Sequence, residues 1–327
     1  MKFSFILCTR NSERVLTEVV ESIANQKIDN RLIEVILADY DSTDQTIEIV
    51  KNISNKNKIK LVEIKCTQPG KTPALEMALD IAIGDYSVIV DDDNVLDKNY
   101  IEEAEKILVE PNWGCIGSQG IVDEKLVLPA WFNEYKGHYA IGVPLSAKDW
   151  VWGAGCIINM IAWKRLRKNS YEIQLNPKRI SHSHPIGVGG EDTELSLAIY
   201  MLGYKVKFVK ALKFINKFDQ KRLNKKYLLE NVRGVCRSIP ILEIYRLIIY
   251  KSNFLLPKAV WILILSKIVV GCILRWIINI FKNKPFKARY NYEIMAGTIS
   301  GFLYFRKNFN RIHNKLIVIK NYNSNFK

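Results

Sequence analysis

The sequence predicts an α/β protein with a mostly parallel sheet flanked by helices, followed by a basic and apolar helical region. Three observations lead to this prediction. Short apolar runs alternate with stretches of helical periodicity through the first 91 residues, as is typical of parallel strands joined by crossover helices. Polar clusters follow three of those runs. The charge also reverses: residues 1–204 hold 22 lysines and arginines against 29 acids, whereas residues 205–327 hold 26 against 4.

The first strand and helix lie at the amino end. Phe3–Cys8 is an apolar run interrupted only by Ser4 and predicts a buried strand. Ser12 is a residue type that caps helices, and the apolar residues after it recur at helical spacing. Those residues are Leu16, Val19, Val20 and Ile23.

Two more strands follow in the same way. Ile33–Ala38 predicts the second strand, and the segment through Ile47 and Val50 predicts the helix after it. Ile59–Ile64 predicts the third strand.

A fourth repeat begins at the turn 69–71. Thr72 is expected to cap a helix that has Pro73 at its first position. Gly84 is expected to end this helix, just before the β-branched strand 86–91. The buried helix face is predicted to hold Leu75, Ala78, Leu79 and Ala82.

Three consecutive acids, Asp91, Asp92 and Asp93, end the fourth strand. Open α/β sheets place ligands at the carboxyl ends of their strands. Adjacent carboxylates repel one another unless solvent or a cation neutralises them, and their hard oxygens suit Mg²⁺ or Mn²⁺. The alternative is a solvated acidic turn. The clusters 9–11 and 39–44 should emerge at the same edge as 91–93, which favours a shared site.

A second acidic cluster lies downstream. His182 and His184 lead through a glycine-rich segment to Glu191 and Asp192, and a helical pattern follows, closed by Gly203. Acids in the first turn of a helix are favoured by its dipole, so capping is one explanation for Asp192 and Glu194. A glycine-rich loop that delivers a carboxylate to a site would also suit a general base.

These motifs, taken together, resemble the family 2 glycosyltransferases of the GT-A fold over residues 2–223. Six motifs occur in family order: CTRN, DYDSTDQT, PGKTPALEMAL, VIVDDDN, WGAGCIINMIAW and GGEDTEL. The resemblance implies an enzyme that transfers a sugar from a nucleotide-sugar donor to a hydroxyl group with inversion. UDP is the expected nucleotide because the enzymes that the chain resembles mostly use it.

The resemblance also implies residue roles. Asp91 and Asp93 match the Asp-x-Asp motif, which holds ribose and a divalent ion, Mg²⁺ or Mn²⁺, bound to the diphosphate. Asp192 matches the general base, and Glu191 the acid beside it. The nucleotide-sugar pocket would be lined by Thr9, Arg10, Asn11, Glu13, Asp39, Asp41, Lys71, Asp91 and Asp92. The segment beneath the sugar and the acceptor would be Trp152, Gly153 and Ala154.

The chain departs from the family pattern at Asn216. The family often carries a histidine there, six positions before the Arg-Leu pair that stands here at 222–223. If that histidine helps to hold the metal, coordination is weaker here or is completed differently, with His182 and His184 as candidates. No Gln-x-x-Arg-Trp signature of processive synthases follows the predicted base, so the enzyme is expected to add one sugar per encounter.

Two other function classes stay open. One is a catalytically silent nucleotide-sugar-binding protein, which Asn216 makes conceivable. The other is a nucleotidyltransferase or phosphotransferase, which fits poorly. Those enzymes need a glycine-rich loop or paired aspartates at the first strand, whereas this strand ends in Thr-Arg-Asn and the first glycine is Gly70.

Residues 255–281 form an apolar run interrupted only by Lys258, Lys267 and Arg275. The run is long enough to cross a bilayer, but its cations favour a helix that lies on or in the membrane with snorkelling side chains. Anionic lipid is the expected partner of residues 251–305. The alternative is a buried helix of a soluble protein. Nucleic acid is not expected, because no nucleic-acid-reading module is recognisable.

The sequence predicts a catalytic domain over residues 1–218, with a nucleotide-sugar half to about 123 and an acceptor half over 124–218. Residues 219–327 are predicted to form a membrane-associating helical region. The first apolar run is too short for a signal peptide, so the expected location is the cytoplasmic face of a bacterial membrane, peripheral or monotopic, or with a single span. The expected acceptor is a lipid-linked or surface glycan.

Overall fold

The structure of the chain is a computed structural model that describes residues 1–26, 33–68, 70–144, 147–175, 189–250 and 257–324. The chain divides into two compact units. The first comprises Met1–Ile173 and Gly203–Gln220, and the second comprises Gln174–Leu202 and Lys221–Lys327. Residues 174–202 thus group with the carboxyl-terminal helices, although the sequence-based division placed them before residue 218. The boundaries of the predicted domains stay predictions.

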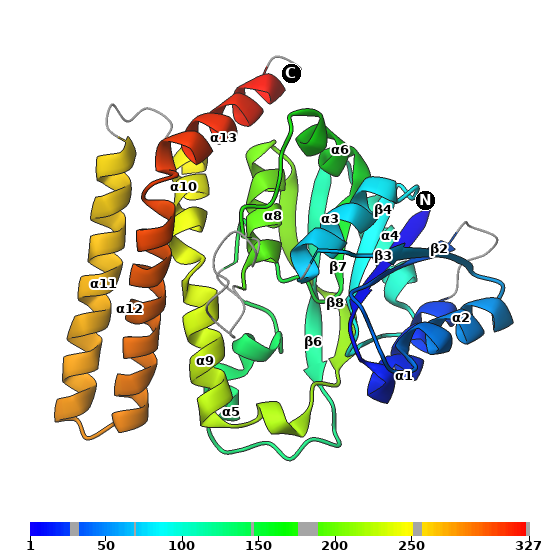
Figure 1. Ribbon diagram of the computed structural model, residues 1–327, viewed down its shortest axis with the longest axis horizontal. Coiled ribbons are helices and arrows are strands. Elements are labelled where there is room, and N and C mark those ends of the chain that lie inside the picture. Colours follow the sequence, from blue (N-terminus) through cyan, green and yellow to red (C-terminus); the bar gives the residue numbers. More distant parts are fainter. Residues whose placement is uncertain (27–32, 69, 145–146, 176–188, 251–256, 325–327) are drawn as a thin grey trace. The chain divides into compact units, whose positions relative to one another are not determined.

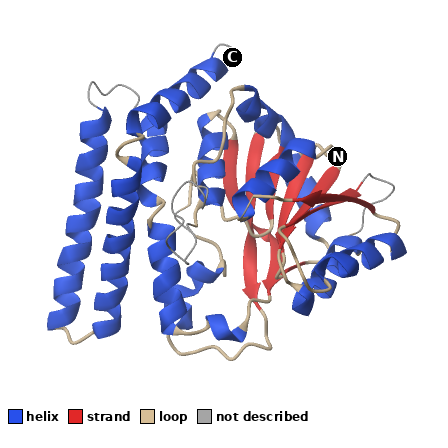
Figure 2. Ribbon diagram, in the orientation of Figure 1, coloured by secondary structure: helices blue, strands red, loops and turns tan. Residues whose placement is uncertain are grey.

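One eight-stranded sheet, in the order β3-β2-β1-β4-β7-β6-β8-β5, forms the centre of the described part of the first unit (Figures 1 and 2). Its strands are β1 Phe3–Thr9, β2 Ile33–Asp39, β3 Lys60–Lys65, β4 Tyr86–Asp91, β5 Asn94–Leu96, β6 Trp113–Val122, β7 Cys156–Asn159 and β8 Lys205–Asn216. Strand β1 pairs in parallel with β2 and β4, and β2 with β3. β7 and β5 run antiparallel to their neighbours. The predicted mostly parallel sheet is confirmed.

The helices of the first unit are α1 Glu13–Ala24, α2 Thr46–Lys56, α3 Lys71–Ile81, α4 Tyr100–Leu108, α5 Phe132–Tyr135, the 3-10 turn η1 Lys136–Tyr139 and α6 Met160–Lys168. Figure 2 shows them beside the strands. The predicted apolar face of α1 is buried over Leu16, Val19, Val20 and Ile23. Burial of each such side chain contributes about 1.5–3 kcal/mol, which fixes the helix against the sheet.

Two of the expected helix ends are wrong. Helix α3 begins at Lys71, two residues before Pro73, and Gly70 takes the N-cap position with φ +108°. Helix α3 has its C-cap at Ala82 rather than at Gly84. Gly84 has a different role, because a Cβ atom there would lie 2.7 Å from the backbone nitrogen of Ser4. Close approach of the chain to β1 therefore requires glycine at this position.

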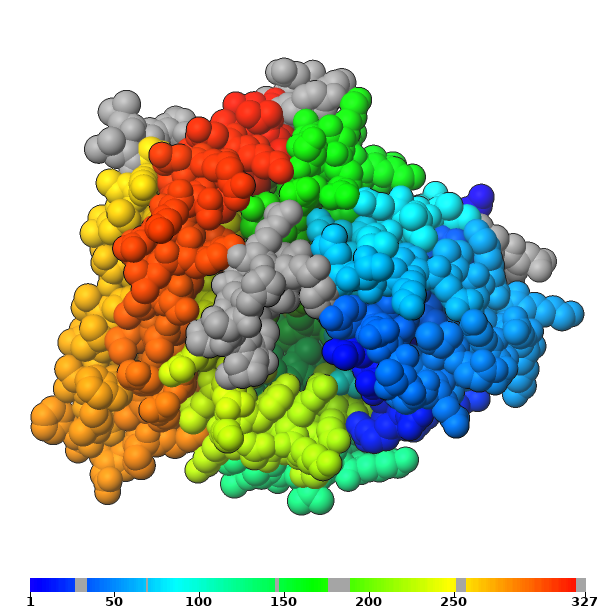
Figure 3. Space-filling view, in the orientation of Figure 1, coloured from blue at the N-terminus to red at the C-terminus, as the bar shows by residue number. Residues whose placement is uncertain are grey.

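The second unit consists of helices in its described part. They are α8 Glu191–Met201, α9 Lys225–Cys236, α10 Ile239–Tyr250, α11 Pro257–Phe281, α12 Pro285–Phe305 and α13 Phe309–Ser324, with the 3-10 turn η2 Gln220–Arg222 at the junction. Helix α12 lies beside α11 along its length (Figures 1 and 3).

The glycines of α12 face α9 and the start of α10. A Cβ atom at Gly297 would lie 2.6 Å from the carbonyl oxygen of Arg233, and one at Gly301 would lie 2.2 Å from that of Arg237. The two glycines therefore serve the contact with α9 and the start of α10, while α12 also packs against α11. The small residues let α12 approach the backbone of α9 closely.

Helix α11 is long and apolar enough to cross a membrane, by length and composition alone. Only 17% of its most apolar window is buried, so the alternative of a buried core helix is not favoured. Trp261, Leu265 and Cys272 form the buried side. Lys251 and the rest of 251–256 lie outside the described residues.

Candidate active site

Three neighbouring strands end at one edge of the sheet. Thr9 at the end of β1 lies opposite Asp39 of β2, and Cys8 lies opposite Asp91 of β4. The parallel register therefore brings together the polar clusters that follow these strands, as the sequence predicted.

The side chain of Asp92 is held by two hydroxyl groups from the end of β1 and the loop after it. Thr9 donates a hydrogen bond to Asp92 Oδ2 at 3.0 Å, and the Ser12 hydroxyl donates to the same oxygen. Ser12 was expected to cap α1, but its side chain makes no capping bond. The serine instead orients the acid motif across 80 residues of sequence, a role that no local signal could have indicated.

Asp91 is neutralised by a side chain of this chain. The Lys71 ammonium forms an ion pair with Asp91 Oδ1. Lys71 is the first residue of α3, and Gly70 before it, with its positive φ, sets the direction of the helix start. The cation required by the adjacent acids is therefore supplied in part by lysine.

Asp93 is tied to the end of β8. Its Oδ1 accepts a hydrogen bond from Asn94 Nδ2 at 3.0 Å. Its carbonyl oxygen accepts one from the backbone nitrogen of Lys217 at 2.7 Å. The Lys217 side chain, 9% exposed, forms ion pairs with Glu18 and Asp123. Lys217, which sequence reasoning missed, thereby fixes the end of β8 beside the acid motif.

The loops after β1 and β2 hold each other through polar contacts. Asn11 Oδ1 accepts a hydrogen bond from the Thr43 backbone at 2.8 Å. Glu13 Oε2 accepts one from Gln45 at 2.9 Å, at the start of α2. The Arg10 guanidinium lies 4.9 Å from the centre of the Tyr40 ring. Asn11 and Glu13 thus hold together the two loops that would form the predicted nucleotide pocket.

Asp39 is a buried carboxylate, 7% exposed. Its two oxygens accept hydrogen bonds from the backbone and the hydroxyl of Ser42. Asp41 has a left-handed backbone with φ +56°. The turn 39–42 is therefore preorganised at the edge of the sheet.

One thiol lies among these charges. Burial raises the pKa of the Cys8 thiol to about 12, with opposing contributions from Lys71, which lowers it, and Asp91, which raises it. The thiol thus stays protonated at neutral pH and is a poor nucleophile. Cys8 acts as a packing residue at the end of β1.

The predicted sugar and acceptor segment lies in the first unit and is buried. Trp152 is 7% exposed, and its indole donates a hydrogen bond to the Ser118 carbonyl at 2.9 Å. Its ring lies 4.6 Å from that of Phe208. Ala154 is buried as well, and so is Gly153. The indole is rigidly held between β6 and β8.

Glu191 and Asp192 lie in the first turn of α8, in the second unit. Asp192 Oδ1 accepts a hydrogen bond from the Thr193 backbone at 2.6 Å. Gly190 before them has φ +103°, and a Cβ atom there would lie 2.7 Å from Ser238 Oγ. Position 190 therefore requires glycine, and helix α8 with its two acids begins directly after it. His182 and His184, with the start of the glycine-rich segment, lie outside the described residues.

Glu194 lies in the first turn of α8, as expected, and its side chain also binds neighbouring segments. Its carboxylate is fully buried. It accepts hydrogen bonds from the backbones of Gln174 and Leu175, each at 2.8 Å, and from the Tyr245 hydroxyl at 2.7 Å. Glu194 therefore joins α8, α10 and the segment before residue 176 within the second unit.

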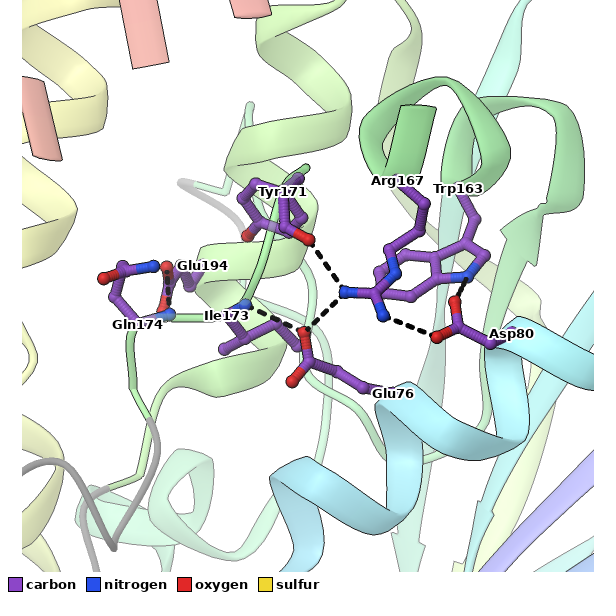
Figure 4. A network of polar contacts seen from close by, with 8 residues as sticks. All are labelled: Glu76, Asp80, Trp163, Arg167, Tyr171, Ile173, Gln174 and Glu194. Atoms are coloured by element: carbon purple, nitrogen blue, oxygen red, sulfur yellow. Dashed lines mark hydrogen bonds and ion pairs between the residues drawn. The ribbon is translucent and has the colours of Figure 1, made fainter. Parts of the chain in front are cut away.

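Helix α3, which carries Lys71, is held by a polar network in the first unit (Figure 4). Arg167 of α6 forms ion pairs with Asp80 at 2.6 Å and Glu76 at 3.6 Å. Asp80 also accepts a hydrogen bond from the Trp163 indole at 3.0 Å. These contacts fix the far part of α3, so the position of Lys71 is set by a rigid helix.

The donor set at this edge fits a divalent ion that arrives with phosphates. No group of three or more His, Cys, Asp or Glu side chains that could hold a metal occurs within the described ranges. Asp91 and Asp93 offer hard carboxylate oxygens, and Mg²⁺ commonly binds through one or two carboxylates plus phosphate oxygens. The amide oxygens of Asn216 and Asn94, which lie opposite each other on β8 and β5, are buried without a hydrogen-bond partner. They add unused oxygen donors next to Asp93.

Removal of the Ser12 hydroxyl should weaken donor binding. Asp92 would lose one of its two hydroxyl donors, and hydrogen bonds to charged groups contribute about 1.5–3 kcal/mol. If the chain binds UDP, as the sequence resemblance implies, Ser12→Ala is expected to raise the Kd for UDP roughly tenfold, as measured by calorimetric titration. Thr17→Ala, on the exposed side of α1, is the control. Equal affinities of the two variants would contradict a positioning role for Ser12.

Comparisons with known proteins agree on this part of the chain. A family model described as Glycosyl transferase family 2 matches residues 4–142. The poly(ribitol-phosphate) beta-N-acetylglucosaminyltransferase TarS of Staphylococcus aureus is 34% identical over 110 residues, which are 34% of this chain and 19% of TarS. The matched segment thus spans about a fifth of the length of that curated relative.

Two solved structures resemble the chain over most of its length. The mannosyltransferase PcManGT from Pyrobaculum calidifontis, in complex with GDP-Man and Mn²⁺, has a TM-score of 0.58 at 18% identity, covering 92% of this chain and 87% of that chain. TarS 1-349 of S. aureus in complex with UDP has a TM-score of 0.50 at 17% identity, covering 94% and 92%. At these identities the likeness concerns the fold alone.

Proposed function

Because residues 4–142 of this chain belong to Glycosyl transferase family 2, on a GT-A fold, we propose that it is an inverting, non-processive glycosyltransferase. It would move one sugar per encounter from a nucleotide-sugar to a hydroxyl of a lipid-linked or surface glycan. The observation that carries the proposal is the register of β2, β1 and β4, which gathers Asp39, Thr9 and Asp91 at one sheet edge.

The donor is proposed to be a UDP-sugar bound at this edge. Asp39 would face the base, and Lys71 and the Asp91–Asp93 motif would face the diphosphate. TarS 1-349, which shares the fold, binds UDP in its crystal structure, and the preorganised contacts of Asp39 and Asp92 support a site that needs little rearrangement. The remaining predicted contacts are Thr9, Arg10, Asn11, Glu13, Asp41 and Asp92.

The chemistry is proposed to be a single displacement. Asp192 would accept the proton of the acceptor hydroxyl as that hydroxyl attacks the anomeric carbon, with Glu191 beside it. Mg²⁺ or Mn²⁺ held by Asp91 and Asp93 would stabilise the charge that develops on the leaving nucleoside diphosphate. Lys71 would supply a positive charge to the same group. Trp152, Gly153 and Ala154 would support the sugar and the acceptor.

A panel of nucleotide sugars, tested by thermal shift and then by product analysis, tests this function. A UDP-sugar that raises the melting temperature and is converted to UDP in the presence of acceptor or water supports it. Binding without any turnover, with Mn²⁺ present, would favour the silent binding protein instead. Stabilisation by no nucleotide sugar would contradict both.

Metal dependence is expected to require Asp93. In the wild-type protein, Mn²⁺ should add to the stabilisation that UDP gives, because bound ligand shifts the unfolding equilibrium. Asp93→Ala is expected to abolish that added shift and to leave the melting temperature without Mn²⁺ nearly unchanged. Glu124→Ala, an exposed acid of the first unit, is the control. An undiminished Mn²⁺-dependent shift in Asp93→Ala would contradict the assignment.

The membrane is proposed as a partner of the second unit, at the cytoplasmic face. Leu263, Val270, Leu274 and Phe281 of α11 are 52–86% exposed, and their spacing places them on one side of the helix. The buried residue Leu265 lies about half a turn away from Leu263. Exposed Lys267, four residues after Leu263, lies on the same side. An exposed apolar face opposite the packed side, with lysines that can snorkel, is typical of a helix that lies in a membrane interface.

Loss of the apolar stripe should release the protein from vesicles. Wild-type protein is expected to float with vesicles of phosphatidylcholine and phosphatidylglycerol, whereas Leu263→Gln with Val270→Gln and Leu274→Gln should stay in the vesicle-free fraction. Each exposed leucine contributes about 1.5–3 kcal/mol when it is removed from water. Val109→Gln with Val127→Gln, which changes two 77% exposed residues of the first unit, is the control. Flotation of the triple variant with the wild type would contradict the assignment.

A further inference from the structure

A pocket lined mostly by charged residues lies between α9 and α12 in the second unit. Its volume is about 460 Å³, and it is open to solvent on one side. Four α9 residues line one wall, and two α12 residues line the other. The lining is Lys226, Leu229, Glu230, Arg233, Arg289 and Glu293.

Glu293 holds two arginines at this pocket. Its side chain is 5% exposed. Arg289 Nε forms an ion pair with Glu293 Oε1 at 2.6 Å, and Arg233 Nε forms one with Glu293 Oε2 at 2.5 Å. The Tyr292 ring lies 4.8 Å from the Arg289 guanidinium and 6.0 Å from that of Arg233. One buried carboxylate therefore orients two guanidinium groups side by side.

The ion pairs of Arg233 and Arg289 to Glu293 both run through Nε, and both guanidinium groups lie near the Tyr292 ring. A guanidinium bound through Nε still has donors for a second partner, in a planar fork that matches phosphate oxygens. Lys226 adds an ammonium from the same wall. Three cations against two acids leave one positive charge in the lining, which complements the single negative charge of a phosphodiester.

The surroundings of the pocket are also basic. Segments 225–233 and 282–293 together hold seven lysines and arginines and two glutamates. The starts of α9 and α12 meet, because Lys225 Nζ lies 4.8 Å from the centre of the Phe286 ring. Excess positive charge at a concave site raises the local concentration of anions.

We propose that this pocket is a phosphate-binding site of the second unit, distinct from the donor site, and that Arg233 and Arg289 bind the phosphate through their terminal nitrogens. Its ligand is a phosphodiester, supplied by a membrane lipid headgroup or by a soluble molecule. This proposal goes beyond the proposed function and does not require that the chain be a glycosyltransferase.

The test compares full-length wild-type protein with Arg233→Lys/Arg289→Lys. This variant keeps the charge and the ion pairs to Glu293 but removes the planar forks. The matched control is Arg306→Lys/Arg311→Lys, which changes two exposed arginines of the same unit. Melting curves of all three proteins establish that each is folded. A second variant, Lys226→Gln, removes a cation that has no role in holding Glu293.

The test has two experiments, a vesicle arm and a soluble arm. The vesicle arm compares binding to phosphatidylcholine vesicles with and without phosphatidylglycerol. Phosphatidylcholine also carries a phosphodiester, but its choline balances the charge, so binding to it serves as the baseline. The increase with phosphatidylglycerol reports recognition of a phosphodiester with a net negative charge, and the charge-conserving Arg233→Lys/Arg289→Lys variant separates this recognition from general electrostatic attraction. That increase is expected to fall about tenfold in Arg233→Lys/Arg289→Lys, to fall in Lys226→Gln and to persist in the control. The soluble arm titrates each protein with glycerophosphoglycerol by calorimetry.

The two arms identify the source of the phosphate. A loss confined to the vesicle arm assigns the pocket to a lipid headgroup, and saturable soluble binding that the variant loses assigns it to a soluble phosphodiester. If Arg233→Lys/Arg289→Lys behaves as the control does in both arms, the proposal is overturned, whatever the result for phosphatidylcholine vesicles.

Discussion

Asp192→Asn is expected to lower turnover by about 10²–10⁴-fold, because general-base catalysis contributes a factor of this size. The amide is nearly the same size as the carboxylate but cannot accept the proton of the acceptor hydroxyl. Donor binding should be unchanged, since the nucleotide contacts proposed here come from the first unit. The measurement is a single-turnover rate beside the Kd for UDP.

Two comparisons make this result specific to the base. Glu21→Gln, an exposed acid of α1, should keep the wild-type rate. The rate of wild-type protein should rise with pH through the pKa of the base, and Asp192→Asn should lose this dependence. A variant with more than a third of the wild-type rate would show that another group removes the proton.

Glu194→Gln is expected to lower the free energy of unfolding by about 3 kcal/mol. The fully buried carboxylate accepts hydrogen bonds from two backbone N–H groups and from Tyr245. An amide has one acceptor oxygen, so at least one of these donors would be left unsatisfied in the interior. Urea denaturation measures the loss.

The same substitution at Glu48, an exposed acid in the first turn of α2, serves as the stability control for Glu194. It should change the free energy of unfolding by less than about 0.5 kcal/mol, as is usual at sites without such contacts. Tyr245→Phe should recover part of the Glu194→Gln loss in a double-mutant cycle, because the two residues share a hydrogen bond. If the effects of Glu194→Gln and Tyr245→Phe simply add, the loss of stability does not arise from the hydrogen bond between these two residues.

Most of the fold of the first unit could be predicted from sequence, because its signals are local. The apolar runs at Phe3–Cys8 and Ile33–Ala38 form β1 and β2, and the acids at 91–93 end β4. Parallel strands align their carboxyl ends, so the convergence of the three polar clusters followed from the order of the elements. Local periodicity carries this information.

The contacts of the site could not be predicted, because they depend on pairs that are distant in sequence. Ser12 looks like a helix cap, yet its hydroxyl binds Asp92. Lys71 matched a residue near the donor, but its ion pair with Asp91 required the position of α3. Glu194 looked like a first-turn acid, although it binds Tyr245. In each case the partner of the side chain depends on the tertiary structure and could not be identified from the local sequence.

The ion pair between Lys71 and Asp91 has a consequence for the empty protein. The Lys71 ammonium is already paired with Asp91. An isolated metal ion would therefore have to compete with this ammonium for the carboxylate. A nucleoside diphosphate changes that balance, since it brings negative charge for the lysine and oxygens for the ion. If the proposed metal site is correct, the lysine would make metal binding depend on the nucleoside diphosphate.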